Sequence, residues 1–108
     1  MSEHVFDEAK WQAMTIFARM GNIGSEVGRS AKAFMANDSE SFDGAFRRTI
    51  DLFDATVAGL VRQRSCRVRE VLLARDQFVA QYFGDLPAVS PGLEAYFMQF
   101  AVADRIKK

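Results

Sequence analysis

The sequence predicts an all-α protein: a single domain built as an antiparallel four-helix bundle with up-down-up-down topology. Apolar residues recur at intervals of three and four through nearly the whole chain, which is the spacing of one face of a helix. No run alternates apolar and polar residues with the enrichment in β-branched types that a strand needs. The 108 residues are 49% hydrophobic and include only two prolines, which supports one substantial core and few helix breaks.

The first helix is expected over residues 7–35. Its apolar face extends from Ala13 to Phe34. Gly21, Gly24 and Gly28 lie along one side, and each costs about 1 kcal/mol of helix stability relative to Ala. We therefore expect another helix backbone, or a ligand, to approach closely there.

The second and third helices are expected over 38–62 and 65–83. A capping box precedes the second helix, with Asn37 as the capping residue, and Ser65 is a candidate cap for the third. Gly84 follows its last turn. Because the break between these helices contains neither Gly nor Pro, a kinked continuous helix is the alternative.

The fourth helix is expected over 91–106, where Ser90 supplies a cap and Pro91 the first helical position. It is apolar on two opposite sides, although a helix in one four-helix domain needs a single buried face. We expect the second stripe to form the interface of a homodimer, and burial on all sides within the monomer is the alternative. The residues of this candidate dimer face are Met98, Val102 and Ile106.

Two charged residues interrupt apolar stripes: Arg75 in the third helix and Asp104 in the fourth. A desolvated charge needs a partner, so the pattern predicts a buried ion pair between them, with Glu26 or Asp54 as other acceptors for Arg75. The sharper interpretation makes Arg75 the reader of a phosphate or carboxylate in a pocket between helices.

Polar residues on the first helix form a candidate surface for a partner or a small ligand. They are Trp11, Asn22, Glu26 and Arg29. The alternative is structural: Trp11 covers the end of the bundle, and Glu26 and Arg29 form an ion pair at i,i+3.

One basic cluster stands out, in which four arginines fall within eight residues. They are Arg62, Arg64, Arg67 and Arg69. They form a candidate contact for nucleic acid or an acidic partner, and a solvated end of the bundle is the simpler alternative. The formal net charge of zero argues against nucleic acid as a partner of the whole chain.

No catalytic, metal-binding or cofactor-binding constellation is visible. His4 and Cys66 are the only residues of their types, which excludes a Cys/His zinc site and an internal disulfide. A single thiol fits a reducing, cytoplasmic location. No stretch approaches the roughly 18 apolar residues of a membrane span.

These observations predict a non-enzymatic helical-bundle protein that acts by self-association and by binding a protein partner whose identity the sequence does not specify. The alternative function is a helical companion subunit that presents nucleotide or RNA to a catalytic partner such as a nucleotidyltransferase, an analogy that rests on the architecture and the arginines. The neutral total hides an asymmetry: residues 1–54 hold six Lys and Arg against nine Asp and Glu, whereas residues 55–108 hold eight against five. This division favours self-complementary packing.

Overall fold

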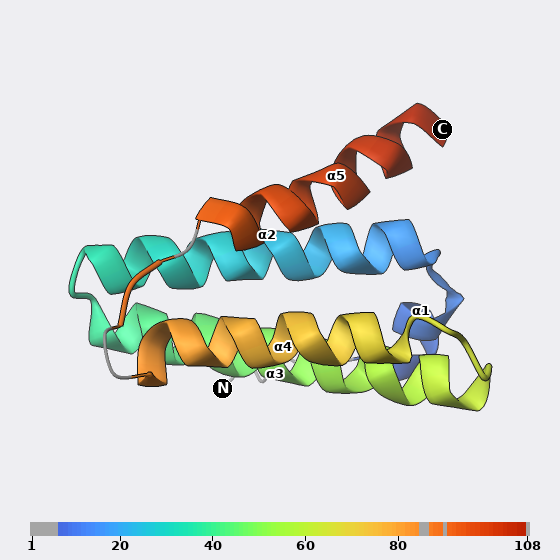
Figure 1. The fold of residues 1–108 in the computed structure, drawn as a ribbon, viewed down its shortest axis with the longest axis horizontal. Helices are drawn as coiled ribbons and strands as arrows, with labels where there is room; N and C mark the ends of the chain where they lie inside the picture. The colour runs from blue at the N-terminus through green and yellow to red at the C-terminus, as the bar shows by residue number, and fades with distance from the viewer. Residues whose placement is uncertain (1–6, 85–86, 90, 108) are drawn as a thin grey trace.

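The computed structural model describes residues 7–84, 87–89 and 91–107, and every element of regular structure in these ranges is an α-helix (Figure 1). The helices are α1 (Glu8–Ala13), α2 (Ile16–Met35), α3 (Ser39–Arg62), α4 (Val68–Phe83) and α5 (Pro91–Lys107). The predicted all-α class is confirmed. The predicted number of four helices is wrong, because the short helix α1 is separate from α2.

The helix predicted over 7–35 is interrupted at Met14 and Thr15, which have extended ψ angles of 152° and 160°. Thr15 is the N-cap of α2, and its Oγ1 accepts a hydrogen bond from the backbone N–H of Ala18 at 3.1 Å. A Thr hydroxyl competes for backbone donors, which favours it as a cap over an interior position. Because the chain turns here, residues of α1 and α2 that share a face on a continuous helical wheel do not share a face in the structure.

The turn after α2 and the turn after α3 each contain a residue in the left-handed conformation. These residues are Asn37, with φ 57°, and Arg64, with φ 53°. In both turns the next residue donates its backbone N–H to a carbonyl five residues earlier, at 2.9 Å: Asp38 to Ala33 and Ser65 to Leu60. This hydrogen bond is typical of a Schellman motif. Asn37, predicted as the cap of the next helix, instead terminates α2. Because the left-handed conformation of Arg64 interrupts the helical path, α3 and α4 are separate helices and the kinked alternative is wrong.

The N-terminal caps of α3 and α4 also differ from prediction. Asp38 caps α3 and accepts a hydrogen bond from the backbone N–H of Ser41 at 3.1 Å. Helix α4 begins at Val68 rather than at 65, because Ser65 uses its Oγ within the turn, where it accepts from the N–H of Arg67 at 3.1 Å.

Helices α2, α3 and α4 lie side by side with alternating chain direction, and α5 runs back along α2 (Figure 1). Towards the C-terminus α5 diverges from α2, and it touches α4 far less than it touches α2. The short helix α1 sits against α3 near the start of α2. One side of α5 is therefore left uncovered by the other helices.

The core is centred on Phe53 of α3, which is fully buried. Its ring centroid lies 6.0 Å from that of Phe78 on α4 and 5.9 Å from that of Phe97 on α5. The α2 residues of the same cluster are Met20, Ile23 and Val27. Phe97 thus anchors α5 in the core and determines which side of that helix faces outward.

Candidate interaction surface

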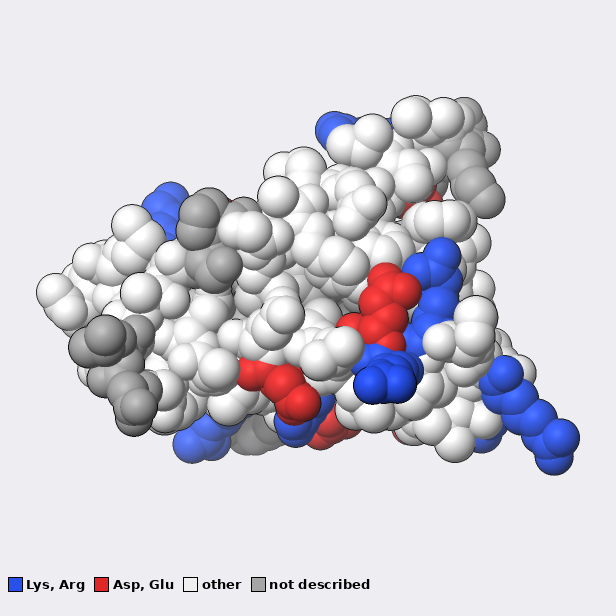
Figure 2. Space-filling view, in the orientation of Figure 1, with Lys and Arg blue, Asp and Glu red and all other residues white. Residues whose placement is uncertain are grey.

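The outward side of α5 carries the predicted second apolar stripe. Met98, Val102 and Ile106 are 59%, 38% and 77% exposed, whereas Phe97 on the inner side is 2% exposed. Helix α5 is therefore not buried on all sides within one chain. Figure 2 shows that the surface over α5 is mostly uncharged, while charged side chains gather around α4 and the α3–α4 turn. An apolar stripe left open on one helix is typical of an interaction site.

The inner side of α5 approaches α2 closely at two glycines. A Cβ atom on Gly24 would lie 2.6 Å from the Cβ of Phe97, and one on Gly21 would lie 3.4 Å from the Cα of Ala101. The close approach predicted from the glycines is confirmed, and the approaching element is α5. Gly28 differs from the other two, because a Cβ there would have no neighbour within 4 Å.

Two shallow grooves follow the seam between α2 and α5. One has a volume of about 280 Å³ and is lined by Gly28, Glu94 and Met98, among others. The other measures about 380 Å³ and includes Asn22, Met98 and Arg105 in its lining. Met98 lines both grooves, so the exposed stripe borders two neighbouring hollows into which side chains of another helix can pack.

Two charged residues of α5 flank Met98 and Val102 along the helix. Glu94 lies in the first turn of α5 and Arg105 near its last turn, and both are exposed. Neither takes part in an ion pair among the residues that the structure describes. Burial raises the pKa of Tyr82 to about 12, and the charge of nearby Glu94 contributes to the same shift.

The edge of α5 that faces α4 is held by polar and aromatic contacts. The hydroxyl of Tyr96 donates to Oε2 of Glu70 at 2.6 Å, and the guanidinium of Arg67 lies 5.9 Å from the centroid of the Phe100 ring. Burial raises the pKa of Tyr96, and the bond to the Glu70 carboxylate raises it further. These contacts fix the rotation of α5 about its axis, so the stripe stays outward.

Trp11 does not belong to the predicted polar surface with Asn22, Glu26 and Arg29. Its side chain is 7% exposed, and its Nε1–H donates to Oγ1 of Thr56 on α3 at 3.0 Å. The reason is the break at Thr15, which turns α1 onto α3. Trp11 therefore covers the end of the core, as the structural alternative predicted.

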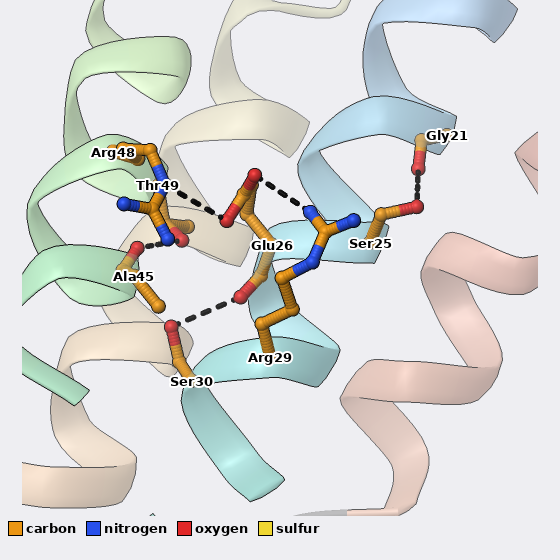
Figure 3. Close-up of polar contacts among 8 residues, drawn as sticks. All are labelled: Gly21, Ser25, Glu26, Arg29, Ser30, Ala45, Arg48 and Thr49. Atoms are coloured by element: carbon orange, nitrogen blue, oxygen red, sulfur yellow. Dashed lines mark hydrogen bonds and ion pairs between the residues drawn. The ribbon is translucent and has the colours of Figure 1, made fainter. Parts of the chain in front are cut away.

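Glu26 and Arg29 form the predicted i,i+3 ion pair, with Arg29 NH1 2.7 Å from Oε2 of Glu26 (Figure 3). The other oxygen of this carboxylate lies 3.3 Å from Nε of Arg48 on α3, so Glu26 bridges two helices. Beyond this pair opens a groove of about 590 Å³ that Arg29, Arg48 and Asp38 help to line. Asn22, the last member of the predicted surface, donates its side-chain N–H to the carbonyl of Ala18 at 2.8 Å.

Arg75 and Asp104 do not form the predicted buried pair. Nε of Arg75 lies 2.9 Å from Oδ1 of Asp54 on α3, and the side chains are 30% and 59% exposed. Asp54, one of the two other acceptors considered, is thus the partner. Helix α4 packs on α3 with Arg75 at the rim, and the sparse contact of α4 with α5 keeps Asp104 in another environment. An anion site that needs a desolvated Arg75 is not supported by this geometry.

The four arginines at the α3–α4 end differ in their partners. Arg62 lies 3.8 Å from Oε2 of Glu8, and Arg67 lies 3.5 Å from Oε1 of Glu70. Arg64 and Arg69 are exposed. Two of the four arginines therefore already have an acidic neighbour within the chain.

Sequence reasoning missed Arg19, which is 3% exposed although it carries a charge. Its NH1 donates to Oε1 of Gln12 at 3.0 Å, Gln12 in turn donates to the carbonyl of Ala55 at 2.8 Å, and burial lowers the pKa of the guanidinium. A signal was present: Arg19 falls three residues after Ile16 and four before Ile23, in register with the buried side of α2. These bonds join α1, α2 and α3.

Among the described residues no group of three His, Cys, Asp or Glu side chains could hold a metal ion. Cys66 is exposed and unpaired with another thiol, and His4 lies outside the described residues. Within the same ranges no helix combines the length and apolarity needed to cross a membrane.

Comparison with known proteins found no match, whether with family models, with curated proteins or with solved structures.

Proposed function

We propose that this chain is a non-enzymatic interaction module that acts by self-association, with the outer side of α5 as its contact with a second copy. In this proposal α2 to α5 form an antiparallel four-helix bundle with up-down-up-down topology, and α1 covers one end. A cytoplasmic location fits the exposed thiol of Cys66, because reducing compartments keep thiols free. The dimer would in turn present its remaining surface to a protein partner.

The exposure of Met98, Val102 and Ile106 on an anchored helix carries this proposal. Burying one such side chain is favourable by about 1.5 to 3 kcal/mol when it starts fully exposed. The six side chains, three from each copy, are on average somewhat more than half exposed and would contribute that share of the full sum, about 5 to 10 kcal/mol. Association costs about 4 to 15 kcal/mol in lost freedom, so the grooves beside Met98 must contribute as well and the dimer is expected to be of moderate affinity.

The alternative function, a nucleotide- or RNA-presenting companion subunit, has weaker support. It rests on the four arginines between 62 and 69, of which Arg62 and Arg67 already face carboxylates. Phosphate binding by Arg62 and Arg67 would have to compete with these intramolecular pairs. Direct titration with single-stranded RNA at low salt tests this alternative, and binding that weakens steeply with salt would revive it.

Sedimentation velocity over a range of micromolar concentrations tests the proposal. The parent is expected at twice the 12.1 kDa chain mass, and Met98→Glu is expected at the mass of one chain, because a carboxylate would enter the apolar contact. Leu73→Glu is the matched control: Leu73 is 53% exposed on α4, against 59% for Met98, and should leave the dimer intact. A parent that stays monomeric, or equal behaviour of the two variants, would refute the α5 interface.

A further inference from the structure

We propose that the two copies pair through antiparallel α5 helices, with Glu94 of each copy against the partner's Arg105. This inference rests on the proposed self-association and specifies its geometry. The observations behind it are the exposed stripe of α5, the position of one charge outside any described ion pair on either side of Met98 and Val102, and the open space at Gly28.

Glu94 and Arg105 lie on the same side of α5. They are separated by eleven residues, about three helical turns, so their directions differ by only about 20° and their Cα atoms by about 16 Å along the axis. Met98 and Val102 lie between them along the helix and turn progressively further outward. The face therefore carries an acid before Met98 and a base after Val102 along one edge, and Ile106 continues the apolar stripe one residue beyond Arg105.

A twofold axis that crosses this face near its middle reverses the order of the charges in the second copy. Glu94 then lies opposite the partner's Arg105, the same contact is repeated by symmetry, and Met98 packs near the partner's Val102. Parallel helices would instead set Glu94 against Glu94 and Arg105 against Arg105, which is unfavourable. The charge pattern thus selects the antiparallel arrangement, as flanking charges do in coiled coils.

Gly28 supplies room for this contact. It costs α2 about 1 kcal/mol relative to Ala, and no internal neighbour requires it, since a Cβ there would meet nothing within 4 Å. Gly28 lines the same 280 Å³ groove as Glu94 and Met98. In the antiparallel pair the partner's Arg105 reaches this level of the helix on the groove side, where its aliphatic stem can lie over Gly28 while its guanidinium meets Glu94.

Charge reversal gives the first test, read by sedimentation equilibrium in low salt. Glu94→Arg and Arg105→Glu each replace two attractive contacts by two repulsive ones, and each is expected to raise the dimer dissociation constant about tenfold or more. The double variant Glu94→Arg with Arg105→Glu restores opposite charges and should return to within about threefold of the parent. A double variant as weak as the singles would overturn the pairing.

Disulfide trapping gives an independent test of direction, in a Cys66→Ser background that removes the native thiol. A mixture of the Glu94→Cys and Arg105→Cys chains is oxidised, and the cross-linked species are identified by mass. The antiparallel arrangement predicts mixed dimers in clear excess over either homodimer. A preference for 94-to-94 links with the parent still dimeric would refute the register alone, whereas a monomeric parent would refute the proposed function itself.

Discussion

The two glycines Gly24 and Gly28 differ by one turn of α2, and the structure assigns them opposite responses to the same substitution. At both positions Ala improves helix propensity by about 0.5 to 1 kcal/mol. At Gly28 nothing opposes this gain, because the new Cβ has no neighbour within 4 Å. Gly28→Ala should therefore raise the free energy of unfolding of the monomer by about that amount.

At Gly24 the new Cβ would lie 2.6 Å from the Cβ of Phe97, about 1 Å closer than carbon atoms pack. A Cβ atom cannot swing away as the end of a long side chain can, so relief requires α5 itself to shift. Phe97 is 2% exposed and its ring packs against Phe53, so such a shift also disturbs the core. Overpacking of this kind costs about 1 to 3 kcal/mol, and Gly24→Ala should be less stable than Gly28→Ala by that difference.

Urea unfolding followed by circular dichroism measures both variants, in the Met98→Glu background so that association does not contribute. If the same variants are unfolded by heat instead, a difference of 1 to 3 kcal/mol corresponds to roughly 4 to 12 °C or more in Tm for a domain of this size. Equal stability of the two variants, or a more stable Gly24→Ala, would show that α5 does not pack on α2 at this distance.

Three further predictions concern single positions. Arg64→Gly should stabilise the protein by about 0.5 to 1 kcal/mol in chemical unfolding, because Arg64 has φ 53° and only glycine adopts that region freely. The free energy of unfolding should fall as the pH rises from 10 to 12, because the unfolded chain ionises Tyr82 and Tyr96 near pH 10, whereas the folded chain keeps both protons longer, that of Tyr82 until about 12. Tyr82→Phe should make this fall less steep, with Tyr96 supplying the remainder, and an unchanged profile would contradict the burial of the Tyr82 phenol. Arg75→Met should cost less than about 1 kcal/mol, since its partner Asp54 is 59% exposed, and unfolding of this variant would refute a peripheral pair.

The helical class and the positions of the long helices could be predicted because they depend on local periodicity. Helix α3 runs from Ser39 to Arg62, within one residue of the expected start, and α5 begins at the expected Pro91. The break at Thr15 was missed because the apolar period continues across it, so that only the capping ability of one hydroxyl marked the turn. That single miss also misplaced Trp11, whose direction was inferred from a helix that does not continue.

Side-chain partners across helices were harder to predict, since they depend on the register between helices and the sequence does not encode that register locally. Arg75 was correctly expected to need an acid, yet Asp104 and Asp54 both satisfied the pattern. The choice was made by the packing of α4 on α3 and the divergence of α5. Arg64 was also hard to predict: the backbone hydrogen bonds of the turn hold an exposed arginine in a conformation that glycine or asparagine would signal in the sequence.

Some of the acids in the first half of the chain form ion pairs with bases of the second half within one molecule. Glu8 with Arg62 and Asp54 with Arg75 each join an acid of the first half to a base of the second. The outer side of α5 does not depend on the charge asymmetry between the two halves, because it carries one charge of each sign on a single helix. Raising the salt from 0.1 to 1 M shortens the screening length from about 10 to about 3 Å and weakens exposed pairs, whereas it does not weaken the burial of apolar surface. If the apolar centre of α5 supplies the affinity and its two charges supply the direction, high salt should loosen the register of the pair well before it separates the two copies.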